Sequence, residues 1–266
     1  MTYLKLIWKI NKGLTIFSMV FISLFQLLML YLVTTFDTQA MLHSILNQMP
    51  ENMKIFLNDS FFNMLTVNGA AAFGLNHPIV LALLAMIAIS IPVRHISREI
   101  ENGNMEGMLA LPFRRRSLVL QLWFSGCLIL GAIILASCIS SLASILIFHD
   151  LTWNVSFHIM EISLNLWLLF VLIMTYTILI ATLSRGGGSS GIVSAMITLL
   201  FYLLFFTGQL WAAFKITLPF NIFNYYQPQN IMFGKGNLLV DCIVLASLIV
   251  ILLYASVFTF EKRDIP

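Results

Sequence analysis

The sequence predicts an all-α protein that crosses a membrane several times. Hydrophobic residues make up 60% of the 266 positions, charged residues make up 9%, and the mean hydropathy is +0.95. Soluble domains are roughly 45 to 50% apolar and about 25% charged. A soluble fold of this length could not bury so much apolar surface, and no loop is long enough for a soluble domain. We therefore expect a single transmembrane domain over residues 1–266.

Six apolar stretches are long enough to cross a bilayer. A hydrocarbon core about 30 Å thick needs about 20 residues of helix, because lipid offers the backbone no hydrogen-bond partner. The six stretches are residues 14–33, 73–93, 118–147, 162–183, 192–211 and 238–258. The third is longer than a straight span requires, so we expect it to tilt, or to kink near Gly126 and Gly131.

The basic residues orient these six spans. Cytoplasmic loops of membrane proteins carry an excess of Lys and Arg. With both termini inside, the cytoplasmic cations are Lys5, Lys9, Lys12, Arg94, Arg98, Arg114, Arg115, Arg116, Arg185, Lys262 and Arg263, and the external ones are Lys54, Lys215 and Lys235. This bias predicts that both termini are cytoplasmic. We expect the chain to be an integral protein of a bacterial inner membrane. The net charge of +3 is too small and too scattered for a nucleic-acid reader.

Three shorter segments lie outside the spans. The spacing of Lys5, Lys9 and Lys12 before the first span predicts an interfacial helix on the inner leaflet, the alternative being a disordered tail with anchoring lysines. Apolar residues at near-helical spacing in 37–76 predict short external helices. The segment 211–237 mixes aromatics, Pro and Gly, which is typical of an interfacial or re-entrant segment, and we expect short external helices here between spans 5 and 6 as well.

The cytoplasmic loop 94–117 carries the densest group of charges and the clearest motif. Asn104 is a suitable N-cap for a short helix that Pro112 would end, with Glu106 in its first turn. Arg114, Arg115 and Arg116 precede the third span, where they act as topology anchors or pair with anionic lipid. Such a short charged helix is suited to docking against a partner.

The segment ISREIENGNMEGMLALPFRRRSLVL (96–120) resembles the signature of ABC-2 type exporter permeases, roughly E-x-x-x-G-T-L-E-L-L-L-x-x-P-x-S-R followed by a membrane span. Asn104 and Met105 stand where the pattern has Thr and Leu, and one arginine of the run 114–116 stands where it has Ser. The resemblance implies a coupling helix between spans 2 and 3 that fits a groove of a separate ATPase subunit. By analogy the docking residues would be Glu99, Glu101, Gly103, Asn104, Met105, Glu106, Leu109, Pro112 and Arg116.

The resemblance also implies that the chain works with partner subunits, and that transport and ATP hydrolysis are carried out by different chains. The permease would pair with a second copy or a homologue and would move a substrate outward when the ATPase closes. ATP and Mg²⁺ would be bound by that partner, because the chain has no G-x-x-x-x-G-K-[ST] loop and its glycine cluster SRGGGSSG (184–191) lacks the lysine. That cluster is either a hinge or a simply flexible loop. No catalytic motif indicates an enzyme.

Polar residues inside spans are the usual markers of a transport pathway. The candidates are Gln26, Gln121, Asn165 and Asp241. External histidines and methionines (His43, His77, His149, His158, Met41, Met49, Met53 and Met64) raise the idea of copper handling, although their spacing is not that of a compact ligand set. Two other classes stay open: an ATP-independent carrier or channel, and a membrane scaffold for an assembly pathway.

Overall fold

The computed structural model describes residues 3–35, 66–103, 115–149, 151–184 and 187–263. The long helices are α1 (Tyr3–Thr35), α6 (Pro78–Pro92), α9 (Arg115–Phe148), α10 (Trp153–Leu183), α11 (Gly187–Leu210) and α13 (Leu238–Lys262). The shorter ones are α5 (Val67–Asn76), the π-helix η1 (Val93–Ser97), α7 (Arg98–Glu101), the 3₁₀ helices η2 (Ala212–Phe220) and η3 (Ile222–Tyr225), and α12 (Pro228–Met232).

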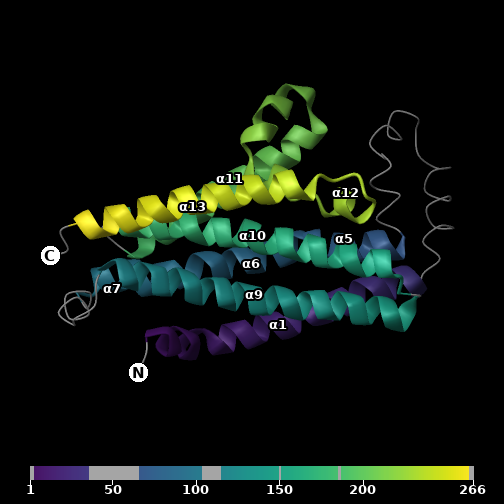
Figure 1. The fold of residues 1–266 in the computed structure, drawn as a ribbon, viewed down its shortest axis with the longest axis horizontal. Helices are drawn as coiled ribbons and strands as arrows, with labels where there is room; N and C mark the ends of the chain where they lie inside the picture. Colours follow the sequence, from purple (N-terminus) through teal and green to yellow (C-terminus); the bar gives the residue numbers. More distant parts are fainter. Residues whose placement is uncertain (1–2, 36–65, 104–114, 150, 185–186, 264–266) are drawn as a thin grey trace.

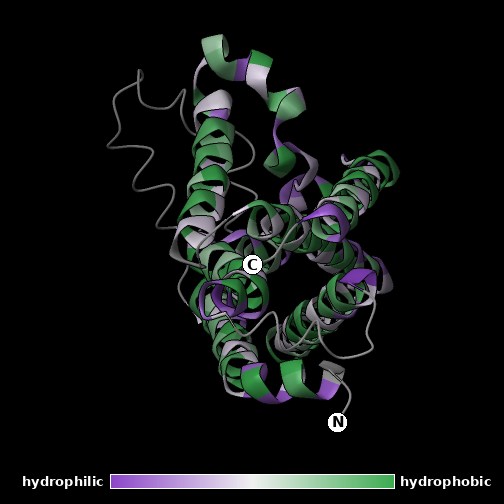
Figure 2. Ribbon diagram, turned by 90° about the vertical axis from the view of Figure 1, so that its left-hand side faces the viewer, coloured by the Kyte–Doolittle hydropathy of each residue, from purple (hydrophilic) through white to green (hydrophobic). Residues whose placement is uncertain are grey.

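Six helical segments are long and apolar enough to cross a membrane. They are Lys5–Thr35, Val67–Glu101, Arg115–Phe148, Trp153–Leu183, Ser189–Leu210 and Leu238–Lys262. Each contains or overlaps one of the six stretches expected from the sequence, so the all-α, six-span fold is confirmed. The long helices lie side by side, and both termini lie at the end of the bundle where α7 ends (Figure 1). Viewed from that end, most of the ribbon is hydrophobic (Figure 2).

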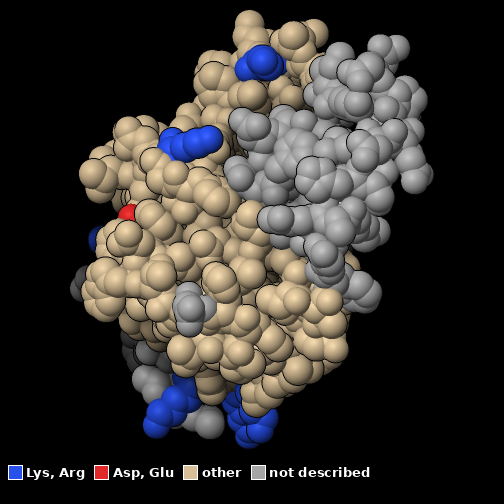
Figure 3. All heavy atoms as spheres, turned by 90° about the vertical axis from the view of Figure 1, so that its right-hand side faces the viewer, with Lys and Arg blue, Asp and Glu red and all other residues tan. Residues whose placement is uncertain are grey.

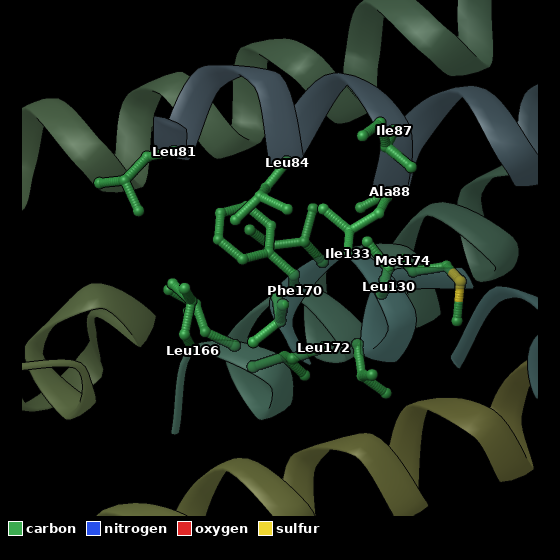
Figure 4. Packing of buried hydrophobic residues seen from close by; sticks show 14 of the residues in the cluster. Leu81, Leu84, Ile87, Ala88, Leu130, Ile133, Leu166, Phe170, Leu172 and Met174 are labelled. Carbon is green, nitrogen blue, oxygen red and sulfur yellow. The ribbon is translucent and has the colours of Figure 1, made fainter. Parts of the chain in front are cut away.

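Helix α10 forms the centre of the bundle. Leu166, Phe170 and Met174 are fully buried, and they meet side chains of α6 and α9 in one apolar cluster (Figure 4). In a membrane such packing is stabilised mainly by van der Waals contact, because lipid tails are as apolar as the side chains. α10 therefore holds the surrounding helices in position.

Two glycines let α9 approach α10 closely. A Cβ on Gly126 would lie 2.1 Å from Sδ of Met174, and one on Gly131 would lie 3.3 Å from Nε1 of Trp167. The same Trp167 Nε1 donates a hydrogen bond of 3.1 Å to the Cys127 carbonyl. The two glycines thus serve helix contact, and α9 is an unbroken helix through both positions.

The first helix is continuous from Tyr3, with no break between the expected interfacial segment and the first span. Its first turns run across the long axis of the bundle, as the two views show (Figures 1 and 2). Ile7 and Asn11 are buried there, whereas Lys5, Lys9 and Lys12 are exposed. The face that carries Ile7 and Asn11 therefore packs on the bundle.

The second span is interrupted between α5 and α6. His77 has an extended backbone (φ −66°, ψ 135°), and Pro78 takes the first position of α6. A residue before proline is disfavoured in the α region, which explains the break. Nδ1 of His77 accepts a hydrogen bond of 3.3 Å from the Ile79 backbone amide and so caps α6. His77, named among the external histidines in the sequence, is thus a capping residue between α5 and α6.

Short helices also occur in the two segments that were expected to be external. In 37–76 the structure describes α5, whose residues Gly69 to Leu75 are largely buried, and residues 36–65 lie outside the described part. Between α11 and α13 the chain forms η2, η3 and α12. The helix η2 projects from the bundle (Figure 1), whereas Tyr226, just after η3, is fully buried and donates a hydrogen bond of 3.2 Å to the Leu75 carbonyl. Gln229 of α12 also donates 2.9 Å to the Gly69 carbonyl of α5, so α5 and α12 pack together at one end of the bundle.

Candidate functional site: the inner stalk and the groove beside it

The second span does not end at Pro92 but continues as η1, α7 and a turn to Gly103. We call residues 93–103 the inner stalk. Its first five residues form a π-helix, a rare conformation that often marks functional positions. The stalk leads directly into the segment 104–114, which holds Asn104, Met105, Glu106, Leu109 and Pro112 and lies outside the described residues.

A glycine ends the stalk. Gly103 has φ +71°, a left-handed conformation that residues with a Cβ rarely adopt. Its backbone amide donates 3.2 Å to the Ile100 carbonyl, and the Asn102 amide donates 2.9 Å to the Arg98 carbonyl. This is the usual way in which a glycine closes a helix C-terminus. Gly103 therefore fixes the direction in which the chain leaves toward the expected docking helix.

Two side-chain contacts join the stalk to other spans. Nδ2 of Asn11 in α1 lies 3.2 Å from Nε2 of His95, and both side chains are buried. Oγ of Ser190 in α11 donates a bond of 2.6 Å to Oγ of Ser97. Buried polar groups are costly to leave without a partner, so these contacts fix the stalk relative to α1 and α11. A displacement of the stalk would be transmitted to both helices.

An arginine bridge joins three more helix ends nearby. Nη1 of Arg115, in the first turn of α9, donates to the carbonyl of Arg263, and Nη1 of Arg263 donates to the carbonyl of Thr182 near the end of α10. Charged donors suit the last carbonyls of a helix, which carry a partial negative charge. Arg115 thus has a structural contact, whereas the neighbouring Arg116 is exposed.

The expected docking residues that are described lie at this same end. Glu99 is half-buried and Glu101 is exposed, both in α7, and Gly103 follows them. Arg116 lies in the first turn of α9. The positions of these four residues agree with a surface open to a partner, and their role in docking stays a prediction.

A groove of about 600 Å³ runs beside the stalk between α6 and α11. Its walls are mostly apolar, and its inner end is lined by Arg94 and Arg98. The opposite end is lined by Pro78 and Phe223. This groove was not expected from the sequence, although Ser90, Arg94 and Arg98 recur every four residues and so indicate one helical face.

The four expected pathway residues do not come together, and none of them lines the groove. Gln26 is fully buried, and its Nε2 donates to the Ala71 carbonyl (3.0 Å) and to Ser141 Oγ (2.7 Å). Gln121 donates 2.9 Å to Ser117 Oγ. Asn165 is buried against Cys242 of α13, and Asp241 lies in the first turn of that helix. Their role in transport stays a prediction.

The structure also locates some of the histidines. Nδ1 of His158 lies 2.9 Å from Oε2 of Glu161 one helical turn away. Within the described ranges, no three His, Cys, Asp or Glu side chains form a group suited to a metal ion. His43 and the methionines Met41, Met49, Met53 and Met64 lie outside those ranges.

The two ends of the bundle differ in charge. The end that carries the stalk and both termini also carries Lys5, Lys9, Lys12, Arg94, Arg98, Arg115, Arg116, Lys262 and Arg263. The other end shows few charged side chains among its described atoms (Figure 3). The described cations of the stalk end are thus those assigned to the cytoplasm from the sequence.

The chain also matches a known family over nearly its full length. Residues 9–265 match the family described as ABC-2 family transporter protein. No curated protein matches the chain. Proteins of this family are generally non-catalytic membrane subunits that pair with an ATP-binding subunit. The six spans and the match over residues 9–265 together show that this chain is an integral membrane protein belonging to the ABC-2 transporter family.

Proposed function

We propose that the chain is the permease subunit of an ABC exporter, in which a separate ATPase docks at the loop 94–117. The observation that supports this best is the inner stalk, a helical extension fixed to α1 and α11 that leads into the motif-bearing segment. Because the stalk is bonded to α1 and α11, a docked partner that moves the stalk would also move these two spans. The ATPase would bind ATP and Mg²⁺, and this chain would bind neither.

The proposed orientation places the stalk and both termini in the cytoplasm of a bacterial cell, across its inner membrane. The excess of Lys and Arg at that end supports this orientation, since positively charged loops stay inside. Two permease subunits, identical or homologous, would act with two ATPases. Export follows if ATP-driven closure of the ATPases favours an outward-open arrangement of the spans, because a ligand shifts an equilibrium only through differential contacts.

Docking can be tested with a charge reversal. Glu106→Arg should abolish stimulation of the partner ATPase in nanodiscs while the protein still inserts and purifies. Glu261→Arg is the matched control, because Glu261 is an exposed acid at the same end of the bundle but on α13. Equal stimulation in both variants and the unmodified protein would contradict docking at the loop.

The partner itself is identified by purification from the native host. We expect a soluble nucleotide-binding protein to copurify with the chain and to be lost with Glu106→Arg. Reconstituted transport should then need that partner and ATP. Flux driven by an ion gradient in its absence would favour a carrier or channel, and a protein that binds partners without any flux would favour a scaffold.

A further inference from the structure

The groove between α6 and α11 has the properties of a binding site for an amphiphile. Apart from its inner end, most of its lining consists of apolar side chains such as Leu81, Ala85 and Ile89. Its volume of about 600 Å³ lies within the roughly 300 to 1,000 Å³ of typical small-molecule sites. Met86 and Leu199, at its rim, are half exposed, so the groove opens sideways toward the membrane.

The inner end of the groove is cationic. Arg94 and Arg98 both line it, and neither guanidinium forms an ion pair with a carboxylate of the described residues. Two hydroxyls of the lining donate to backbone carbonyls: Ser90 Oγ donates 3.1 Å to the Ile87 carbonyl, and Thr198 Oγ1 donates 2.7 Å to the Ser194 carbonyl. Arg94 and Arg98 are the charged residues of the lining and so the groups suited to an anion.

The length of the groove places these arginines at headgroup depth. From Pro78 to Arg98 is 20 residues, or about 30 Å of helix, which equals the thickness of the hydrocarbon core. One end of the groove therefore lies at each face of the membrane, and the cations lie only at the stalk end. An acyl chain that starts at the arginines reaches about half of this distance, along α6 to the level of Ala85.

We propose that the groove binds one anionic phospholipid, with its phosphate between Arg94 and Arg98 and one acyl chain along α6 and α11. Charge complementarity selects this occupant, because two guanidiniums at the end of an apolar channel, with no carboxylate partner among the described residues, match an anionic headgroup joined to an aliphatic chain. Arginine suits phosphate oxygens particularly well because its planar donors bind them in pairs. The site belongs to this chain alone and does not depend on the ATPase.

Native mass spectrometry of the purified chain tests the proposal. The protein is titrated with phosphatidylglycerol or with phosphatidylcholine of the same acyl chains, without any ATPase. We expect a single tight site for phosphatidylglycerol. Each cation near a membrane surface contributes about fivefold in affinity, so Arg94→Gln with Arg98→Gln should weaken this site roughly 25-fold. Lys9→Gln with Lys12→Gln removes two exposed cations from the same end and should leave the site intact.

A second pair of variants tests the apolar part of the groove without touching the arginines. Ala195 lines the groove and Met196 does not, although both are exposed on α11. Ala195→Trp should exclude the acyl chain and lower phosphatidylglycerol binding at least about tenfold, whereas Met196→Trp should have no effect. These comparisons also separate this site from nonspecific charge attraction.

Two results would overturn the proposal. One is equal binding of both lipids by the unmodified protein and the Arg94→Gln, Arg98→Gln variant. The other is efficient disulfide crosslinking of Ala195→Cys between two copies in a bilayer, with no lipid bound, which would identify the groove as a subunit interface. Because lipid binding is measured without the ATPase, loss of the site leaves the proposed permease function untouched, and failure of ATPase docking leaves the site untouched.

Discussion

Asn11 and His95 are 84 residues apart in the chain, yet their buried side chains are 3.2 Å apart where α1 crosses the inner stalk. Nδ2 of Asn11 also donates 2.8 Å to the Ile7 carbonyl. An amide nitrogen has only hydrogens to give, so with this orientation Nε2 of His95 must accept the second one. The imidazole is then neutral, with its proton on Nδ1.

Substitution of Asn11 and His95, singly and together, tests whether their side chains interact. Asn11→Ala and His95→Ala should each destabilise the protein by about 1 to 3 kcal/mol, because the remaining side chain stays buried but loses this hydrogen bond. The double variant should lose less than the sum, with a coupling of at least about 0.5 kcal/mol. Unfolding in SDS measures the four free energies. Additive losses would mean that the two side chains do not interact, and Lys12→Ala, on an exposed position, is the control.

The Ser190–Ser97 contact should matter for coupling more than for assembly. Ser97→Ala removes the acceptor from the stalk and leaves Ser190 without this bond, which costs about 0.5 to 1.5 kcal/mol. If the stalk transmits motion to α11, transport per ATP hydrolysed should fall about two- to tenfold while ATPase binding is unchanged. Ser247→Ala, which removes a bond within exposed α13, should leave the ratio intact. An unchanged ratio in Ser97→Ala would argue against transmission through this contact.

Gly74 and Gln26 should respond to substitution together. A Cβ at position 74 would lie 1.9 Å from Oε1 of Gln26, whose Nε2 is held by Ala71 and Ser141. Gly74→Ala must displace this side chain, so we expect destabilisation of about 1 to 3 kcal/mol. The same change should cost much less when Gln26 is already alanine. Gly13→Ala is the control, since no atom lies within 4 Å of its added Cβ, and thermal unfolding in detergent gives the ranking.

Two adjacent tyrosines provide a matched test of burial. Tyr226 Oη donates 3.2 Å to the Leu75 carbonyl inside the protein, and Tyr225 Oη donates 2.6 Å to the Pro219 carbonyl at the surface. Tyr226→Phe should lower stability by about 1 to 2 kcal/mol, because the buried carbonyl loses its partner. Tyr225→Phe should change it by less than about 0.5 kcal/mol, since water replaces the hydroxyl. Thermal melting compares the two, and equal shifts would contradict the role of burial.

Tyr226 should also make the protein sensitive to alkali. Burial raises its pKa well above 10, the ordinary value for tyrosine. Above about pH 10 the unfolded chain loses this proton and the folded protein keeps it, so stability falls as the pH rises. Tyr226→Phe should therefore show a shallower decline between about pH 10 and 11.5 than the unmodified protein. Parallel declines would mean that other groups cause the alkaline loss.

The fold was largely predictable because the bilayer imposes strict rules on composition. Each apolar stretch of about 20 residues lies in or overlaps one of the six helical segments that are long enough to cross a membrane. An even number of spans places both termini on the same side of the membrane. The sequence could not show where the second span ends, since a run such as Val93 to Ser97 does not reveal a π-helix. It also did not show that the glycines of α9 serve contact with α10, because the partner side chains Met174 and Trp167 are more than 30 residues away.

The functional site was predictable only in part. The motif in 96–120 is a local pattern and could be recognised without a structure. The contacts that join the stalk to α1 and α11 depend on which faces of three helices meet, and the polar residues involved look like ordinary serines and asparagine in sequence. The groove depends on α6 and α11, whose lining residues are about 100 positions apart. Periodicity in a single sequence shows which residues share a face of one helix, but it does not show which faces of distant helices pack together.

The π-helical turn after Pro92 has a consequence for how this chain is compared with its relatives. Each i→i+5 bond closes over one residue more than an α-helical bond would, so every side chain beyond this turn is rotated about the helix axis. A homologue that is α-helical throughout would present equivalent faces only if one position were skipped here. An alignment of this chain with such a homologue should therefore contain a gap of a single residue between Val93 and Ser97.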